Sequence, residues 1–319
     1  FIEAVFEDKN VKAVVTKECM HKLQKQGIFA SNTTSLPIHE LAEALTDPSQ
    51  FIGMHFFSPV DRMPLVEVIR AKQTSEETLA KALRVAHVLG KTPIVVNDSP
   101  GFFTSRIFFN YLLEGITLVL EGIPAAEIES AAAQAGFAVG PLAVLDEISL
   151  PLMMHVYEQL PALSSSQQRA YAYLLKLVNS GRNGRKNGLG FYSYNAEDRS
   201  KSLWKDPEIQ TTEEHIDPTT LSKRLLHVMA LDSYRCLDMG ILENPIDGDL
   251  GSVLGVGFPK HLAGVFAYMD RVGLATFIEE CQQFAAHGEQ WEIPSSLRWL
   301  AQRDFSFYSG FQSNWPKVE

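Results

Sequence analysis

The sequence predicts an α/β protein followed by an all-α region. The α/β part is the second half of a doubly wound parallel sheet, and a duplicated set of helices follows it. Short β-rich runs alternate with helix-period segments over the N-terminal third, long Leu- and Ala-rich helical patterns follow, and landmarks of the middle third recur in the last. We place the domain boundaries at 1–98, 99–200 and 201–319.

Apolar, partly β-branched runs bounded by turn residues predict the strands of the first domain. Between them, residues 8–26 and 75–89 carry apolar side chains at helical spacing, and Ser75 is a suitable N-cap for the second of these helices. The predicted strands are 1–6, 27–30, 51–57, 65–69 and 93–97.

The pattern changes at the turn signal Asp98-Ser99-Pro100-Gly101, and beyond it we predict helices and no clear strand. A glycine-rich loop at 181–192 closes the second domain, and the polar stretch 195–217 is interpreted as a linker. The predicted helices of this domain are 102–120, 126–135, 146–160 and 167–179.

The third domain is interpreted as a second copy of the helical module, because landmarks recur in the same order with small slips. Arg106 and Gly122 match Arg224 and Gly240 at one common offset. The pair Gly136-Phe137 recurs at 257–258, and Asp146 recurs at 270.

Composition excludes several classes of protein. Of 319 residues, 38 are acidic and 28 are basic, which gives a net charge of −10 and argues against nucleic-acid binding. The longest apolar run, 107–120, is interrupted by charge and is too short to span a bilayer, which needs about 20 residues. The 3 cysteines are widely spaced, so we expect buried thiols in a reducing compartment, with no disulfide and no metal site.

His55 and Glu67 form a candidate acid/base pair. They lie on two apolar runs joined by a proline-bearing turn, so two neighbouring strands can bring both side chains to one end of the sheet. Glu67 could then fix the imidazole tautomer and leave the other ring nitrogen free to take a proton. The alternative is a core histidine and a solvated glutamate at a strand end.

Several motifs together resemble the 3-hydroxyacyl-CoA dehydrogenases, and the resemblance covers essentially the whole chain. The helical part, through residues 184–192 and 247–251, is more specifically similar to the α subunit of the multienzyme fatty-acid β-oxidation complexes. This implies a partial NAD-binding, Rossmann-like domain and two copies of the family's helical C-terminal domain. The motifs that carry the resemblance are Ile2-Glu3-Ala4-Val5-Phe6-Glu7, Ala30-Ser31-Asn32-Thr33-Thr34-Ser35, Gly53-Met54-His55-Phe56-Phe57-Ser58-Pro59, Leu65-Val66-Glu67 and Asp98-Ser99-Pro100-Gly101-Phe102.

The resemblance implies NAD-dependent oxidation of L-3-hydroxyacyl-CoA to 3-oxoacyl-CoA, with His55 and Glu67 as the catalytic pair. Thr34 stands where the family usually has a serine that binds the substrate's 3-oxygen; its alternative is a cap for a helix at 35–45. Ser105 stands where many members have an asparagine that positions the acyl group, and its side chain is shorter.

For the cofactor, the resemblance places Glu7, Lys12, Asn32 and Ser58 around NAD. The alternative for Glu7 and Lys12 is a surface ion pair on a first helical turn. The family's glycine-rich fingerprint lies upstream of the first motif and the chain contains none, so we expect a piece of a longer protein that binds NAD weakly or not at all by itself. We also expect an open sheet edge at 1–6.

The partners that the resemblance implies are an acyl-CoA substrate, a thiolase subunit and further copies of the protein, and it favours the bacterial cytoplasm over the mitochondrial matrix. The densest basic cluster available for CoA phosphates is Arg182, Arg185 and Lys186, unless it is simply a solvated loop. Two other functions stay open: a dehydrogenase of a hydroxy acid that is not a CoA ester, and a non-catalytic module that docks a thiolase. The apolar residues of the first long helix are expected in the core: Phe102, Phe103, Phe108 and Leu112.

Overall fold

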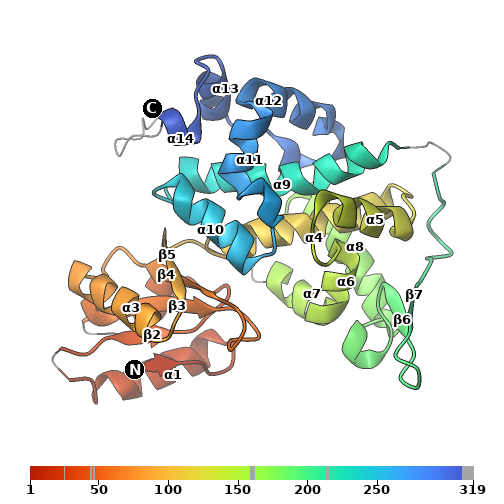
Figure 1. Ribbon diagram of the computed structural model, residues 1–319. Helices are drawn as coiled ribbons and strands as arrows, with labels where there is room; N and C mark the ends of the chain where they lie inside the picture. Colours follow the sequence, from red (N-terminus) through yellow and green to blue (C-terminus); the bar gives the residue numbers. More distant parts are fainter. Residues whose placement is uncertain (25, 44, 46, 159–161, 213–215, 311–319) are drawn as a thin grey trace.

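The computed structural model describes residues 1–310 except 25, 44, 46, 159–161 and 213–215. Its N-terminal part is a five-stranded sheet in the order β1-β2-β3-β4-β5, drawn in red and orange at the lower left of Figure 1. The predicted strands are present, but the first is short because only two of its residues pair. The strands are β1 (Ile2–Glu3), β2 (Phe29–Ser31), β3 (Phe51–Phe56), β4 (Leu65–Arg70) and β5 (Thr92–Asn97).

Helices connect the parallel strands. The connection at 57–64, between β3 and β4, contains no helix and joins two antiparallel strands. Strands β1, β2 and β3 pair in parallel, as do β4 and β5, whereas β3 and β4 pair antiparallel. The antiparallel register places His55 opposite Glu67. The connecting helices are α1 (Lys9–Met20), α2 (Ile38–Ala42) and α3 (Glu76–Val88); α1 is shorter than the predicted 8–26, of which residue 25 lies outside the described residues.

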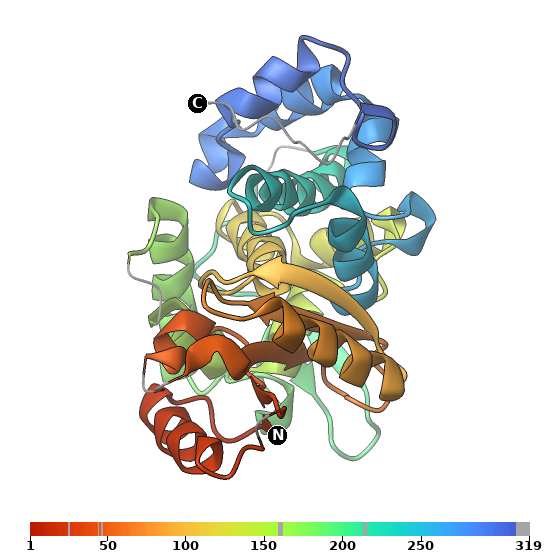
Figure 2. The same cartoon turned by 90° about the vertical axis from the view of Figure 1, so that its left-hand side faces the viewer.

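The sheet is covered on both faces, which explains why its central strands are almost continuously apolar. Ile52 and Met54 of β3 pack in one cluster with Ala82 and Ala86 of α3. Side chains of the opposite parity, such as Phe51, Leu65 and Ile69, belong to the large cluster that continues into the helical part of the molecule. Figure 2 shows α3 lying against the sheet and the second helical module above it. His55 and Glu67 therefore lie on the face that the helical modules cover.

The helical part forms two modules of similar element order. The predicted helix 146–160 is wrong as a single element, because Ser149 has φ +78° and divides α6 from α7; residues 159–160 lie outside the described residues. A small antiparallel hairpin, β6 (Tyr192–Tyr194) and β7 (Lys201–Leu203), was not predicted. The first module contains α4 (Thr104–Leu120), α5 (Ala125–Ala135), α6 (Pro141–Ile148), α7 (Leu150–Glu158) and α8 (Ser165–Asn179). The second contains α9 (Pro218–Asp238), α10 (Pro245–Gly255), α11 (Val265–Val272), α12 (Leu274–Gln283), α13 (Ser295–Ala301) and α14 (Phe307–Gly310).

The repeated aspartates, Asp146 and Asp270, make the same kind of hydrogen bonds in the two modules. Asp146 of α6 accepts backbone N–H groups of residues 191–192, and Asp270 of α11 accepts those of residues 307–308. In each case the carboxylate binds a Phe-Tyr pair at the end of its own module, and the phenylalanine of the pair is buried in the core. The predicted duplication therefore extends to the hydrogen-bonding pattern.

Helices α4 and α9 pack together through a reciprocal pair of ion pairs. Arg224 of α9 contacts Glu114 of α4 at 2.6 Å, and Arg106 of α4 contacts Asp232 of α9 at 3.4 Å. The two arginines are equivalent positions of the repeat. This arrangement is that of a two-fold interface, in which each partner offers the same surface, built within one chain.

No helix of the described ranges is long and apolar enough to cross a bilayer.

The second module also contacts the sheet. Asn97 at the end of β5 donates its backbone N–H to Ile241, and Val95 donates to Asp247 of α10. Gly255, at the end of α10, approaches Leu65 so closely that an added Cβ would lie 2.6 Å from its Cδ2 atom. The second module therefore meets the sheet along α10.

Candidate active site

The His55–Glu67 pair lies at the contact between the sheet and the helical modules. The His55 Nδ1 atom is 2.9 Å from Glu67 Oε2. Glu67 is fully buried and His55 is 6% exposed. The antiparallel register of β3 and β4 produces this contact, because it places the two residues directly opposite each other on one face.

The start of α4 holds the Glu67 carboxylate in place. The Oε1 atom accepts the backbone N–H groups of Phe103 and Thr104, each at 3.0 Å. The Thr104 hydroxyl donates to Oε2 at 2.5 Å, the same oxygen that His55 contacts. A helix N-terminus offers unsatisfied N–H groups and a positive dipole end, so it stabilises the ionised form of a buried carboxylate.

A cleft of about 450 Å³ opens beside His55 between the sheet and both helical modules. Phe57 packs against the imidazole with ring centroids 4.5 Å apart. The wall on the first module is apolar, and Gly255 and Val256 close the cleft on the second. Phe102, Phe103 and Leu112 are core residues as predicted, whereas Phe108 was wrongly placed in the core, because it lines the cleft. The apolar wall consists of Phe108, Phe109, Ile148, Leu152, Met153 and Val156.

Thr34 and Ser105 lie together at the cleft, on opposite sides of the interface between sheet and helices. Both line it, and the Ser105 hydroxyl donates to the Thr34 backbone carbonyl at 3.2 Å. The Thr34 side chain does not cap a helix: α2 begins at Ile38, and Thr33 accepts the nearby N–H of Leu36. The alternative interpretation of Thr34 as a cap is therefore wrong.

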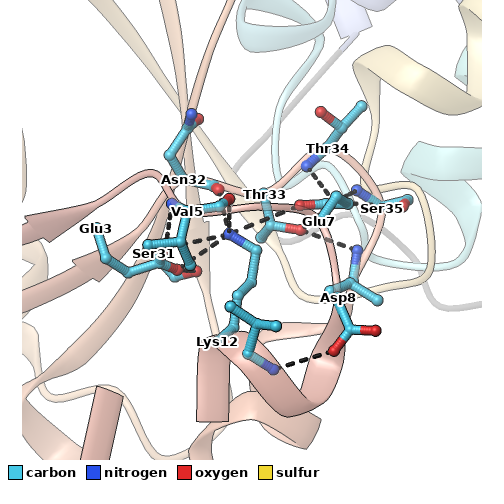
Figure 3. Close-up of polar contacts among 12 residues, drawn as sticks. Glu3, Val5, Glu7, Asp8, Lys12, Ser31, Asn32, Thr33, Thr34 and Ser35 are labelled. Atoms are coloured by element: carbon cyan, nitrogen blue, oxygen red, sulfur yellow. Dashed lines mark hydrogen bonds and ion pairs between the residues drawn. The ribbon is translucent and has the colours of Figure 1, made fainter. Parts of the chain in front are cut away.

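Lys12 is a buried residue, so the alternative of a surface ion pair is wrong for it. Figure 3 shows its ammonium group between the Glu3 carboxylate and the loop that follows β2. The Nζ atom is 3.1 Å from Glu3, 2.7 Å from the Asn32 carbonyl and 3.6 Å from Glu7. Lys12 is 0% exposed. Its charge therefore fixes the backbone at the carboxyl ends of β1 and β2.

Glu7 organises the loop that carries Thr34. Its Oε1 atom accepts the Thr33 hydroxyl at 2.6 Å and the backbone N–H groups of Thr34 and Ser35 at 2.9 and 3.1 Å (Figure 3). Glu7 also lines the cleft. It is thus the residue through which the Lys12 network reaches the cleft wall.

Asn32 and Ser58 follow strands β2 and β3 at their carboxyl ends, where doubly wound sheets bind ligands. The Asn32 Oδ1 atom accepts the backbone N–H of Phe56 at 3.1 Å, which ties the two strand ends together. Ser58 lines the cleft beside His55 and precedes the cis peptide bond to Pro59.

The glycine-rich loop 181–192 is built around Asp146. A Cβ atom added at Gly190 would lie 1.9 Å from Asp146 Oδ1, so this position requires glycine. Arg182 is buried, donates to the carbonyl oxygens of Gly190 and Tyr192, and stacks on Trp204 at 4.2 Å. Arg182 is therefore neither part of a solvated loop nor placed to meet CoA phosphates, because its guanidinium is engaged inside the loop.

The remainder of that basic cluster is exposed. Arg185 pairs with Glu147, and both side chains are more than half exposed.

Within the described ranges, no group of three His, Cys, Asp or Glu side chains is placed to hold a metal ion. Cys236 and Cys281 are buried thiols, and Cys19 is half-buried.

Comparison with known proteins agrees with this geometry. Residues 1–99 match the family described as "3-hydroxyacyl-CoA dehydrogenase, NAD binding domain", and residues 101–194 match "3-hydroxyacyl-CoA dehydrogenase, C-terminal domain". A solved structure of (S)-3-hydroxybutyryl-CoA dehydrogenase PaaH1 from Ralstonia eutropha is 36% identical, with a TM-score of 0.55 over 61% of this chain and 70% of that one. The chain belongs to the 3-hydroxyacyl-CoA dehydrogenase family.

Longer relatives in this family match the chain almost from end to end. The fatty acid oxidation complex subunit alpha of Vibrio vulnificus is 40% identical over 96% of this chain, and that of Shewanella putrefaciens is 39% identical over the same share. The chain spans 44% of each of these relatives. The 3-hydroxybutyryl-CoA dehydrogenase of Escherichia coli K12 has the same fold, with a TM-score of 0.74 at 21% identity over 95% of this chain and 81% of that one.

Because this 3-hydroxyacyl-CoA dehydrogenase chain matches the family's NAD-binding domain, the residues that line its cleft should suit NAD. Glu7, Thr34 and Ser58 line the wall next to His55 and offer a carboxylate and two hydroxyls. A nicotinamide ring is flat and its carboxamide needs such donors and acceptors. The residues present therefore fit the nicotinamide end of NAD, which Glu7 and Ser58 would hold, while Thr34 stays free for the substrate side.

Several residues of the site escaped the sequence analysis. Thr104 could have been found, because it begins a helix directly after a turn signal and such positions bind carboxylates. Leu152 and Val156 could not, because only the break at Ser149 turns α7 toward the cleft. Gly255 comes from the second module and has no local signal at all.

Proposed function

We propose that this chain carries out the NAD-dependent oxidation of L-3-hydroxyacyl-CoA to 3-oxoacyl-CoA in fatty-acid β-oxidation. The observation that carries the proposal is the buried His55–Glu67 pair beside a cleft with one polar and one apolar wall. The polar wall suits the cofactor and the reacting carbon, and the apolar wall suits an acyl chain.

The proton transfer follows from the hydrogen bonds of His55. Oxidation of the alcohol removes a proton from the 3-hydroxyl group and a hydride from C3. Bound NAD supplies the hydride acceptor. Glu67 engages Nδ1, so Nε2 is the ring nitrogen that takes the hydroxyl proton, and the anionic carboxylate stabilises the imidazolium that forms.

Two further residues support the position of the substrate. The Thr34 hydroxyl is available at the cleft to donate to the 3-oxygen, and Ser105 lies beside it on the first turn of α4. Because Ser105 also binds the Thr34 backbone, it couples the substrate loop to the helix that holds Glu67. We propose Thr34 and Ser105 as substrate-binding residues and Glu7, Lys12, Asn32 and Ser58 as the cofactor side of the site, with Lys12 acting through the loop.

The apolar wall favours a CoA ester with a hydrocarbon chain over a small polar hydroxy acid. Six apolar side chains cover the part of the cleft on the first module. We further propose that the protein works in the bacterial cytoplasm, in an assembly that includes a thiolase subunit and further copies of itself. Its relatives named as complex subunits support this proposal.

The test is His55→Gln in the full-length protein, assayed with acetoacetyl-CoA and with free 3-oxo acids. We expect kcat to fall by about 10²- to 10⁴-fold, because the proton acceptor is lost, while KM changes little. The control is His87→Gln, which replaces an exposed histidine on α3. Unchanged kcat in His55→Gln, or equal activity on free acids, would contradict the proposal, and an inactive wild-type protein that still assembles would favour a docking module.

A further inference from the structure

We propose that Thr104 is a positioning residue for the His55–Glu67 pair, and that its hydroxyl limits how strongly Glu67 stabilises the protonated imidazole. The inference rests on the proposed function, in which His55 takes the substrate's proton. It deepens that function by naming a group that holds the carboxylate of the pair in place.

Thr104 is a buried residue whose hydroxyl is bound to the carboxylate of the pair. Its side chain is fully buried, and its hydroxyl donates to Glu67 Oε2 at 2.5 Å. The same oxygen accepts from His55 Nδ1 at 2.9 Å. Two donors therefore share one carboxylate oxygen, while the other oxygen is held by two backbone N–H groups.

Sharing has a predictable electrostatic result. A hydroxyl that donates to an anionic oxygen withdraws part of the charge that would otherwise attract the imidazolium. The hydroxyl also fixes the rotation of the carboxylate, because a donor on each side holds it in one plane. The Thr104 hydroxyl therefore has two effects. It weakens the stabilisation of protonated His55 by Glu67, and it fixes the orientation of the carboxylate.

Four other charged or titratable groups lie around the pair. Arg106 on α4 contacts Asp232 on α9, and Glu7 engages the loop that follows β2. Cys236 on α9 is a buried thiol that interacts with the charge of Glu67, and His155 on α7 lines the far side of the cleft. A substitution at Thr104 leaves these groups in place, so a change in pH dependence reports on the shared oxygen.

The experiment compares Thr104→Val, Thr104→Ser and the control Thr117→Val in the full-length protein. Valine keeps the shape and removes the donor, serine keeps the donor, and Thr117 is a buried threonine of the same helix whose hydroxyl binds only a backbone carbonyl, that of Leu113. For Thr104→Val we expect the acid limb of the pH profile of kcat/KM for oxidation to move to higher pH by about 0.5 to 1 unit, corresponding to one hydrogen bond. Thr104→Ser and Thr117→Val should superimpose on the wild type.

A second measurement separates this inference from the proposed function. The imidazole signals of His55, assigned with His55→Gln, are followed by NMR as the pH is changed, and their midpoint should shift in Thr104→Val alone. If the wild type lacks dehydrogenase activity the proposed function fails, whereas the NMR midpoint still tests Thr104. An unshifted midpoint in Thr104→Val, or an equal shift in Thr104→Ser, overturns the inference. Should the valine variant not fold, Thr104→Ala makes the same comparison.

Discussion

Lys12 shows how a charged residue can become part of a protein core. It is fully buried, and its ammonium group reaches two carboxylates and two backbone carbonyls at the ends of β1 and β2. A buried charge is tolerated only when it is paired in this way. Lys12 therefore supports the cleft by fixing the loop that Glu7 binds.

Replacing Lys12 by methionine should destabilise the protein strongly, because it leaves the Glu3 carboxylate buried without its partner. We expect a loss of about 3 to 5 kcal/mol in the free energy of unfolding, measured from urea denaturation curves. Lys9→Met is the matched control: Lys9 lies on the same helix, and its pairing with Glu40 is exposed, so stability should hardly change. A Lys12→Met protein as stable as wild type would show that the network is dispensable for folding.

Residue types alone predicted part of this site. His55 and Glu67 could be paired from the sequence, because an apolar run, a short proline-bearing turn and a second apolar run fix the register of a hairpin. The burial of Lys12 could not be predicted, because its partners Glu3 and Asn32 come from two different strands. Long-range hydrogen bonds of this kind carry no periodic signal.

At the scale of elements, α4 connects the site to the repeat. Its first turn holds Glu67. Glu114 in its second half and Glu121, which directly follows its last residue, both contact Arg224 of α9. His287 approaches Glu121 as well, at 2.7 Å. Burial alone would raise the pKa of Glu121, but the hydrogen bonds and charges of His287 and Arg224 lower it to about 2.

This shift predicts a pH dependence of stability. A carboxyl group with a lowered pKa in the folded state stabilises the protein fully above its ordinary value of 4.5, and the contribution is lost as the pH falls towards 2. Urea unfolding of wild type and Glu121→Gln should therefore differ most above pH 4.5 and converge in acid. A difference that grows as the pH falls would contradict the assignment. Glu127→Gln, on the first turn of α5, is the control.

The elements themselves were predicted with uneven success. The long helix α4 and the strands β3 and β4 were evident, because their apolar periodicity extends over many residues. The division of α6 from α7 was not, since it depends on the left-handed backbone of Ser149, a residue without a local preference for that conformation. The hairpin of β6 and β7 was missed because each strand has only three residues.

At the scale of the whole molecule, the cleft depends on three parts of the chain that are far apart in sequence. The sheet provides His55, the first module provides the apolar wall, and the second module provides Gly255 and Val256. The duplication could be predicted from the order of its landmarks. The contribution of the second copy to the site could not, because it arises only when α10 packs against β4.

Gly255→Val, a change in the second module, should displace the side chains that pack against His55 in the sheet. A Cβ atom at Gly255 would lie 2.6 Å from Leu65 and 3.3 Å from Phe57, whose ring packs against His55. We expect a loss of about 1 to 3 kcal/mol in stability from overpacking, together with a lower kcat, measured by urea denaturation and steady-state kinetics of the full-length protein. Ile246→Ala, at an exposed position of the same helix, is the control. A stable Gly255→Val protein with normal kcat would show that the second module does not shape the cleft.

The position of α4 has a consequence for evolution and for protein engineering. One end of this helix grips the carboxylate of the proposed catalytic pair, and the other is clamped to the duplicate module by ions of opposite sign. If the two copies were separate chains, the clamp on this helix would depend on their association, and with it the position of the end that grips the carboxylate. Selection for turnover would then keep the copies on a single polypeptide even where folding did not demand it.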